Sequence, residues 1–174
     1  MVSFTKCVKT GKSVYLLYGD AMEAGPQSRK IDFSFNTVYV IESFKDGEKK
    51  CGKELYEDTL RWQSIRNRSF KSCYNDISSF RELEKTFFEI RSEVRKGMCP
   101  VLHFDMHGDK EGVSLKNGDH VDWPYLNGVF QDINIKLKNN LFVTMGTCHG
   151  ANVVKSYVVT QPACMLGFLG FSKK

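Results

Sequence analysis

The chain has 174 residues, enough for one ordinary domain with a substantial core and too few for two, so we expect a single domain over residues 1–174. Hydrophobic residues make up 41% of the sequence and charged residues 26%, which argues against a disordered chain and against a membrane-spanning one. The net charge of +5 comes from lysines and arginines mixed with acidic residues, so no nucleic-acid-binding surface is expected.

The sequence carries no targeting or cross-linking signal. No apolar run reaches the length of a signal-peptide core or a membrane span, and we therefore expect a cytoplasmic protein without a membrane partner. The six cysteines are dispersed without paired spacing, which is typical of reduced thiols rather than of a disulfide framework. Any one of them is by default a small buried hydrophobic residue.

The first part of the chain predicts two strands and a helix. Residues 14–18 and 37–41 are apolar runs rich in β-branched and aromatic side chains, which are typical of buried strands. Residues 22–29, with a glycine and a proline, predict an exposed loop between them. Apolar residues that share one helical face indicate a helix over residues 54–65.

Residues 80–96 give the clearest helical pattern in the sequence. Apolar side chains recur there every three or four positions, Ser78 or Ser79 can cap the first turn, and Gly97 follows the last. An apolar stripe of this kind is more often the core face of a helix than a surface for a partner. We therefore expect this helix to cover a sheet.

The second part of the chain alternates strands and helices. Residues 100–108 and 141–148 are near-continuous apolar runs that predict strands, and residues 164–170 predict a last one. Between the first two we expect a hairpin over residues 112–123 and a helix over residues 123–133, started by an aspartate and a proline. Together with a helix or strand over 153–160, this pattern predicts an α/β fold with a mostly parallel central sheet of five to six strands flanked by helices.

Two chemically active side chains stand at the ends of predicted strands. His107 ends one strand and Cys148 ends the next, and ligands of open parallel sheets bind at the carboxyl ends of strands. A thiol becomes a nucleophile when an imidazole takes its proton. Gly108 lets the backbone turn closely, so its N–H and that of Cys148 can face a developing oxyanion. This pattern predicts acyl transfer by a Cys/His dyad.

The segments around these two residues resemble a known family. The strand LHFDMHG, which ends at Gly108, and the strand LFVTMGTCHG, which contains Cys148, are similar to the motifs of caspase-like cysteine peptidases, and most similar to the bacterial CHAT-type branch. The resemblance covers residues 80–170. It implies a caspase-like fold, Cys148 as nucleophile, His107 as general acid/base, and the Gly108 amide as oxyanion donor. It also implies no cofactor or metal, a protein or peptide substrate, and an upstream sensor or activating partner in bacterial defence or regulated cell death.

The sequence also departs from that family. Caspases have Gln-Ala before the cysteine and metacaspases have Asp-Ser, whereas this chain has Gly146 and Thr147, so neither acidic nor basic specificity is predicted. Asp20 is the remaining acidic candidate for a substrate pocket, with turn capping as its alternative role. The family usually continues beyond the position of Lys174, so we expect a C-terminally incomplete domain, either a fragment or a site completed by a partner.

Two alternatives to the peptidase remain open. His103, His107 and His149 with Cys148 are residue types that bind zinc. However, residues 103 and 107 lie in a predicted strand rather than on a helix, which disfavours ligand spacing and leaves His103 and Asp105 as supporting or buried groups. The second alternative is a catalytically silent regulatory or ligand-binding module that keeps the fold. The presence of both His107 and Cys148 favours the enzyme.

Overall fold

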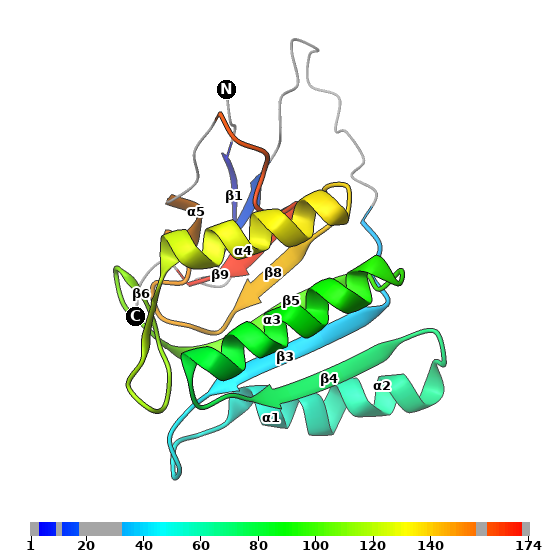
Figure 1. Ribbon diagram of the computed structural model, residues 1–174, viewed down its shortest axis with the longest axis horizontal. Coiled ribbons are helices and arrows are strands. Elements are labelled where there is room, and N and C mark those ends of the chain that lie inside the picture. The colour runs from blue at the N-terminus through cyan, green and yellow to red at the C-terminus, as the bar shows by residue number, and fades with distance from the viewer. Residues whose placement is uncertain (1–3, 10–11, 18–32, 156–159, 172–174) are drawn as a thin grey trace.

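The structure is a computed structural model that describes residues 4–9, 12–17, 33–155 and 160–171, with the backbone alone in the first two ranges (Figure 1). Its main sheet runs in the order β1-β2-β9-β8-β5-β3-β4, and a small hairpin, β6–β7, extends from β5. The strands are β1 Phe4–Lys9, β2 Lys12–Leu17, β3 Thr37–Ser43, β4 Lys71–Asp76, β5 Pro100–Gly108, β6 Gly112–Ser114, β7 His120–Asp122, β8 Phe142–Met145 and β9 Gly167–Gly170.

Most of this sheet is parallel. The four pairings β4–β3, β3–β5, β5–β8 and β8–β9 are parallel, whereas β2 is antiparallel to β9 and β1 is antiparallel to β2. The predicted fold class, a mostly parallel sheet flanked by helices, is therefore confirmed. The main sheet has seven strands rather than the expected five to six, because β1 and β2 form an antiparallel hairpin that extends the five parallel strands at one edge.

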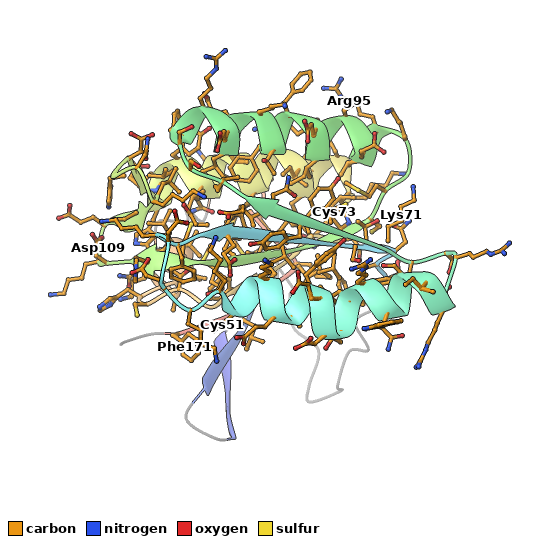
Figure 2. All side chains as sticks on the ribbon, turned by 90° about the horizontal axis from the view of Figure 1, so that it is seen from below. Cys51, Lys71, Cys73, Arg95, Asp109 and Phe171 are labelled. Atoms are coloured by element: carbon orange, nitrogen blue, oxygen red, sulfur yellow. The ribbon has the colours of Figure 1, made fainter. Side chains whose placement is uncertain are left out.

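Helices cover both faces of the sheet (Figures 1 and 2). On one face lie α3 Phe80–Arg95 and α4 Trp123–Lys136, and on the other lies a continuous helical segment made of α1 Cys51–Leu55, η1 Tyr56–Leu60 and α2 Arg61–Arg66. A short helix, α5 Asn152–Lys155, follows β8. None of the helices in the described part of the chain combines the length and apolarity needed to cross a bilayer.

The two long helices begin where their capping residues predict. Ser79 accepts a hydrogen bond from the Glu82 N–H at 3.4 Å, while the Glu82 carboxylate accepts one from the Ser78 N–H at 2.6 Å. Asp122 accepts from the Tyr125 N–H at 2.7 Å at the start of α4. The bonds to Ser79 and Asp122 satisfy N–H groups that the first turn of a helix leaves without partners, and the bond to Glu82 ties the residue before the α3 cap to that turn.

The core lies between the sheet and the α3–α4 layer. Phe87 of α3, Phe104 of β5 and Phe130 of α4 are fully buried, with ring centroids 5.5 to 6.4 Å apart. Because side chains alternate along a strand, Leu102 and Phe104 face this core while His103, Asp105 and His107 share the other face.

Candidate active site

The predicted nucleophile and base lie at one edge of the sheet. Because β5 and β8 are parallel neighbours, their carboxyl ends meet there, and the Gly146 N–H donates to the Phe104 carbonyl oxygen at 2.8 Å just beyond the ladder. The strand predicted over residues 141–148 is shorter than expected, since β8 ends at Met145 and Cys148 stands in a turn. A turn can present a side chain and its amide together, which a continuing ladder would not allow.

Gly108 packs directly against the nucleophile turn. A β-carbon on Gly108 would overlap the Thr147 methyl group and lie 2.6 Å from the Cys148 carbonyl oxygen. No real β-carbon contact is that short, so this approach of two backbones requires glycine. The His-Gly segment and the Cys148 turn are thus in contact.

The Cys148 turn is held from both sides. The Gly150 N–H donates to the Thr147 carbonyl at 3.2 Å, and the Ala151 N–H donates to the Phe171 carbonyl beyond β9 at 3.0 Å. His149 has a φ of 57°, a left-handed conformation that is uncommon for a residue other than glycine. Across residues 33–155 and 160–171, the Cys148 N–H has no hydrogen-bond acceptor.

His107 extends from the end of β5 to an exposed position. Its side chain is 60% exposed, and its ring forms a T-shaped contact with the ring of Phe44, with 5.1 Å between the centroids. Its Nε2 atom lies 2.9 Å from Oε1 of Glu48, and this contact lowers the pKa of the Glu48 carboxyl. Within the described ranges, the thiol of Cys148 makes no hydrogen bond to this imidazole. The structure brings the two segments together but leaves the dyad itself open.

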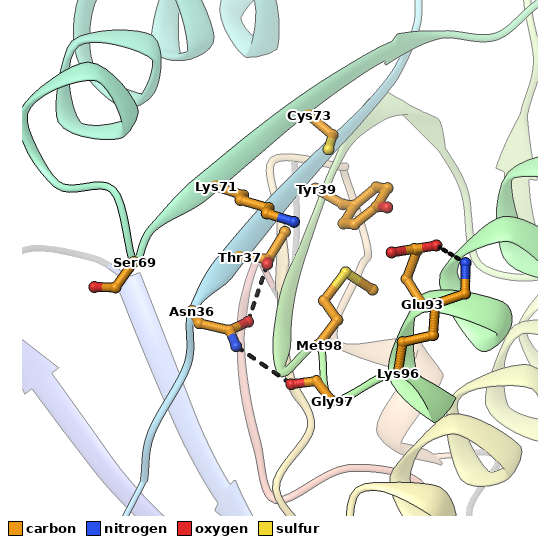
Figure 3. A pocket seen from close by; sticks show the side chains of 10 residues that line it. All are labelled: Asn36, Thr37, Tyr39, Ser69, Lys71, Cys73, Glu93, Lys96, Gly97 and Met98. Carbon is orange, nitrogen blue, oxygen red and sulfur yellow. Dashed lines mark hydrogen bonds and ion pairs between the residues drawn. The ribbon is translucent and has the colours of Figure 1, made fainter.

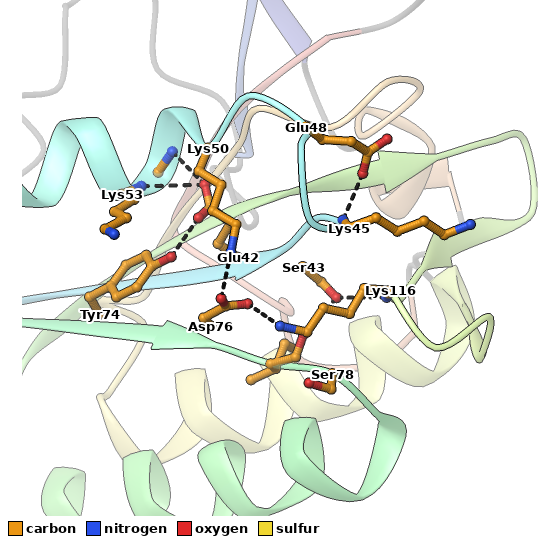
Figure 4. A network of polar contacts seen from close by, with 12 residues as sticks. Glu42, Ser43, Lys45, Glu48, Lys50, Lys53, Tyr74, Asp76, Ser78 and Lys116 are labelled. Atoms are coloured by element: carbon orange, nitrogen blue, oxygen red, sulfur yellow. Dashed lines mark hydrogen bonds and ion pairs between the residues drawn. The ribbon is translucent and has the colours of Figure 1, made fainter.

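Two carboxyl groups are buried beneath this edge. Asp105 is 5% exposed and Glu42 of β3, its register partner, is fully buried. Glu42 accepts from the Gly52 N–H at 2.8 Å at the start of α1 and from the Tyr74 hydroxyl at 2.6 Å (Figure 4). Oδ2 of Asp105 is buried and has no hydrogen-bond partner among the described residues. Burial, together with the charge of Glu42, raises the pKa of Asp105 to about 6.

His103 has a structural role in this arrangement. Its Nδ1 atom lies 2.7 Å from the Thr144 hydroxyl, and burial lowers its pKa, so it is neutral at physiological pH. Within the described residues, no group of three or more His, Cys, Asp or Glu side chains is arranged to hold a metal ion. The zinc alternative therefore has no supporting geometry in that part of the chain.

Two cavities of similar size adjoin the edge. One of about 160 Å³ is lined by His107 and Glu48 together with Lys45 and Lys116. Asp76 fixes Lys116, accepting from its ammonium at 2.6 Å (Figure 4). The other cavity, of about 150 Å³, lies against the segment before Cys148 and is lined by Gly146, His103, Leu169 and Phe171 among others.

A larger cavity, of about 520 Å³, lies at the opposite, amino-terminal ends of β3, β4 and β5 (Figure 3). Its lining includes Asn36, Tyr39, Lys71 and Cys73. It is separated from His107 by the length of β5, so it is not part of the candidate active site. Asp20, the acidic residue proposed for a substrate pocket, lies outside the described residues.

Sequence reasoning missed Glu48 and Glu42. Glu48 stands 59 residues before His107 in an exposed turn, and no local pattern links the two. Glu42 is the penultimate residue of a strand of buried residues, where an acidic side chain could have signalled a buried polar contact. The Glu48 contact depends on the pairing of β3 with β5 and the Glu42–Tyr74 contact on the pairing of β3 with β4, neither of which the sequence specifies by itself.

No family model matches the chain, and no curated protein matches it. Among solved structures, the crystal structure of the Drosophila initiator caspase Dronc is similar, with a TM-score of 0.48 and 14% sequence identity over 82% of this chain. The chain spans 63% of that protein's chain. At this identity neither residue roles nor activity pass from one protein to the other, and the resemblance to the CHAT-type branch stays a prediction.

Proposed function

We propose that the chain is a cysteine endopeptidase in which Cys148 is the nucleophile and His107 the general acid/base. The observation that supports this most is the packing of Gly108 against Thr147 and the Cys148 carbonyl, because it joins the two motif segments at the carboxyl edge of a parallel sheet. The unengaged Cys148 amide, considered within the described residues, adds an available oxyanion donor. The Gly108 amide is the second proposed donor.

The chemistry proceeds by acyl transfer. His107 accepts the thiol proton, and the sulfur of Cys148 bonds to the scissile carbonyl carbon while the π electrons move to oxygen. The oxyanion is bound by the two amides, and His107 gives its proton to the leaving nitrogen as the carbon–nitrogen bond breaks. Water, deprotonated by His107, then attacks the thioester and releases the acid together with the free thiol. No metal or organic cofactor takes part in these steps.

Closure of the thiol–imidazole pair belongs to the substrate-bound state in this proposal. Catalytic hydrogen bonds of free enzymes are often long and shorten in the substrate complex. An open pair also suits a protease whose basal activity rises when an upstream sensor or activating partner acts on it. Only the motif resemblance supports such a partner and a role in bacterial defence or regulated cell death within the cytoplasm.

A catalytically silent regulatory module is the second candidate. The observation that favours it is the missing hydrogen bond between Cys148 and His107 in the described part of the chain. Such a module would keep the fold and bind a protein or peptide without cleaving it.

A peptide library separates the two candidates. The wild-type chain, Cys148→Ala and His107→Ala are incubated with mixed-sequence peptides, and new termini are identified by mass spectrometry. We expect cleavage by the wild type and a loss of at least about a thousandfold in each variant. Cys51→Ala is the matched control, because Cys51 is also a free thiol but stands exposed at the start of α1. Equal cleavage by all four proteins, or by none, would favour the silent module.

A further inference from the structure

The carboxylate of Glu48 is hydrogen-bonded to one ring nitrogen of His107, the proposed general base. Oε1 of Glu48 lies 2.9 Å from Nε2 of His107, and Oε2 of the same side chain accepts from the Lys45 N–H at 2.7 Å (Figure 4 shows the second bond). The Glu48 N–H in turn donates to the Lys45 carbonyl at 3.2 Å, which closes the turn. Both oxygens of Glu48 are therefore engaged, and the carboxylate is fixed in direction relative to the ring.

The orientation of the His107 imidazole ring is restrained by further contacts. Phe44, four residues before Glu48, packs its ring against His107 with an interplanar angle of 84°. The backbone of His107 is fixed by the pairing with Ser114 in β6. Three contacts thus act on this side chain: the strand behind it, the aromatic ring beside it and the carboxylate at Nε2.

The protonation pattern follows from these contacts. The hydrogen bond from His107 lowers the pKa of Glu48, so the carboxyl group is ionised at neutral pH and can only accept. Nε2 must then carry the proton, and in the neutral ring Nδ1 is left with the free electron pair. A thiol can give its proton only to a nitrogen with a free pair.

We infer that Glu48 is a positioning residue of the proposed peptidase: it holds His107 in the tautomer protonated at Nε2 and so reserves Nδ1 for the thiol of Cys148. The catalytic arrangement is then Cys148–His107–Glu48, with the carboxylate supplied by the turn after β3 rather than by either motif strand. The role in catalysis rests on the proposed function, whereas the tautomer rests on the geometry alone.

The variant Glu48→Gln separates positioning from simple packing. Its amide oxygen can still accept from the Lys45 N–H, which keeps the turn, and this directs the amide NH₂ toward Nε2 of His107. An NH₂ group donates, so Nε2 must accept and the proton moves to Nδ1. A residue that served only to shape the turn would tolerate this change.

Nitrogen-15 NMR of the free chain reads the tautomer directly, without any substrate. We expect the Nε2–H form of His107 in the wild type and the Nδ1–H form in Glu48→Gln, with Glu57→Gln unchanged because Glu57 pairs with Lys53 on the helical segment instead. Cleavage of the best library peptide should fall about tenfold to a hundredfold in Glu48→Gln. This is less than the roughly 10⁴-fold effect of a wrong tautomer where the carboxylate is buried, because Glu48 is partly exposed.

The NMR and cleavage results test three separate claims: the tautomer of His107, the role of Glu48 in catalysis and the proposed function. An Nδ1–H ring in the wild type, or an unchanged tautomer in Glu48→Gln, overturns the inference. A changed tautomer with an unchanged cleavage rate overturns the role in catalysis. If the wild type cleaves no peptide, the proposed function fails, while the spectra still confirm or reject the tautomer that Glu48 imposes.

Discussion

Replacing Asp105 by asparagine should change how stability depends on pH. Asp105 is buried beside Glu42, and its pKa is raised from 3.8 to about 6. The protonated form is therefore favoured in the folded state. The stability that protonated Asp105 contributes is fully present below the ordinary pKa near 4 and is lost as the pH rises through about 6. Asparagine is neutral throughout and keeps the shape of the side chain.

The size of the effect follows from the pKa difference. About two pKa units at 1.36 kcal/mol each give on the order of 3 kcal/mol in total, of which about half falls between pH 5 and pH 8. Relative to the wild type, Asp105→Asn should thus gain about 1.4 kcal/mol of unfolding free energy over that range.

Urea denaturation at several pH values measures this difference. Asp58→Asn is the control, since Asp58 is exposed on η1 and should show no such gain. A difference between wild type and Asp105→Asn that stays constant from pH 5 to pH 8, or that shrinks as the pH rises, would refute the reasoning.

Three further substitutions test other parts of the structure. Gly108→Ala should abolish peptide cleavage and lower the melting temperature, because its β-carbon would overlap Thr147; unchanged activity would contradict the close packing. Asp122→Ala should cost about 1 kcal/mol in urea denaturation through loss of the α4 cap, and a neutral result would argue against that cap. Phe87→Ala should cost about 3–5 kcal/mol because the side chain is fully buried, and a cost below about 1 kcal/mol would argue against its place in the core.

The elements with strong local signals could be predicted from the sequence. The caps at Ser79 and Asp122 and the apolar spacing between them fixed α3, the β6–β7 hairpin and α4 to within a few residues. β4 gave no such signal, because an edge strand with mostly part-exposed side chains mixes polar and apolar residues without clear alternation. Its assignment depends on the parallel pairing with β3.

The residues of the candidate site also differ in whether the sequence alone could predict them. His107, Gly108 and Cys148 could be named because each stands at the end of an apolar run, and the sheet does bring those ends together. Glu48 could not, since an exposed glutamate in a turn is ordinary in sequence and gains its meaning only from a contact 59 residues away. The absence of a hydrogen bond between the Cys148 thiol and the His107 imidazole in the described residues likewise depends on side-chain conformation, which sequence spacing does not encode.

The central claim, that His107 activates Cys148, is tested most directly by thiol alkylation. A peptidyl chloromethyl ketone, an alkylating agent whose peptide part occupies the site as a substrate does and so closes the thiol–imidazole pair, is added at pH 7 to the wild type and to His107→Ala, and peptide mapping follows each cysteine separately. We predict that Cys148 reacts at least about tenfold faster in the wild type, because the thiolate is the reactive form, while exposed Cys51 reacts equally in both. Equal rates at Cys148 in the two proteins would contradict the claim.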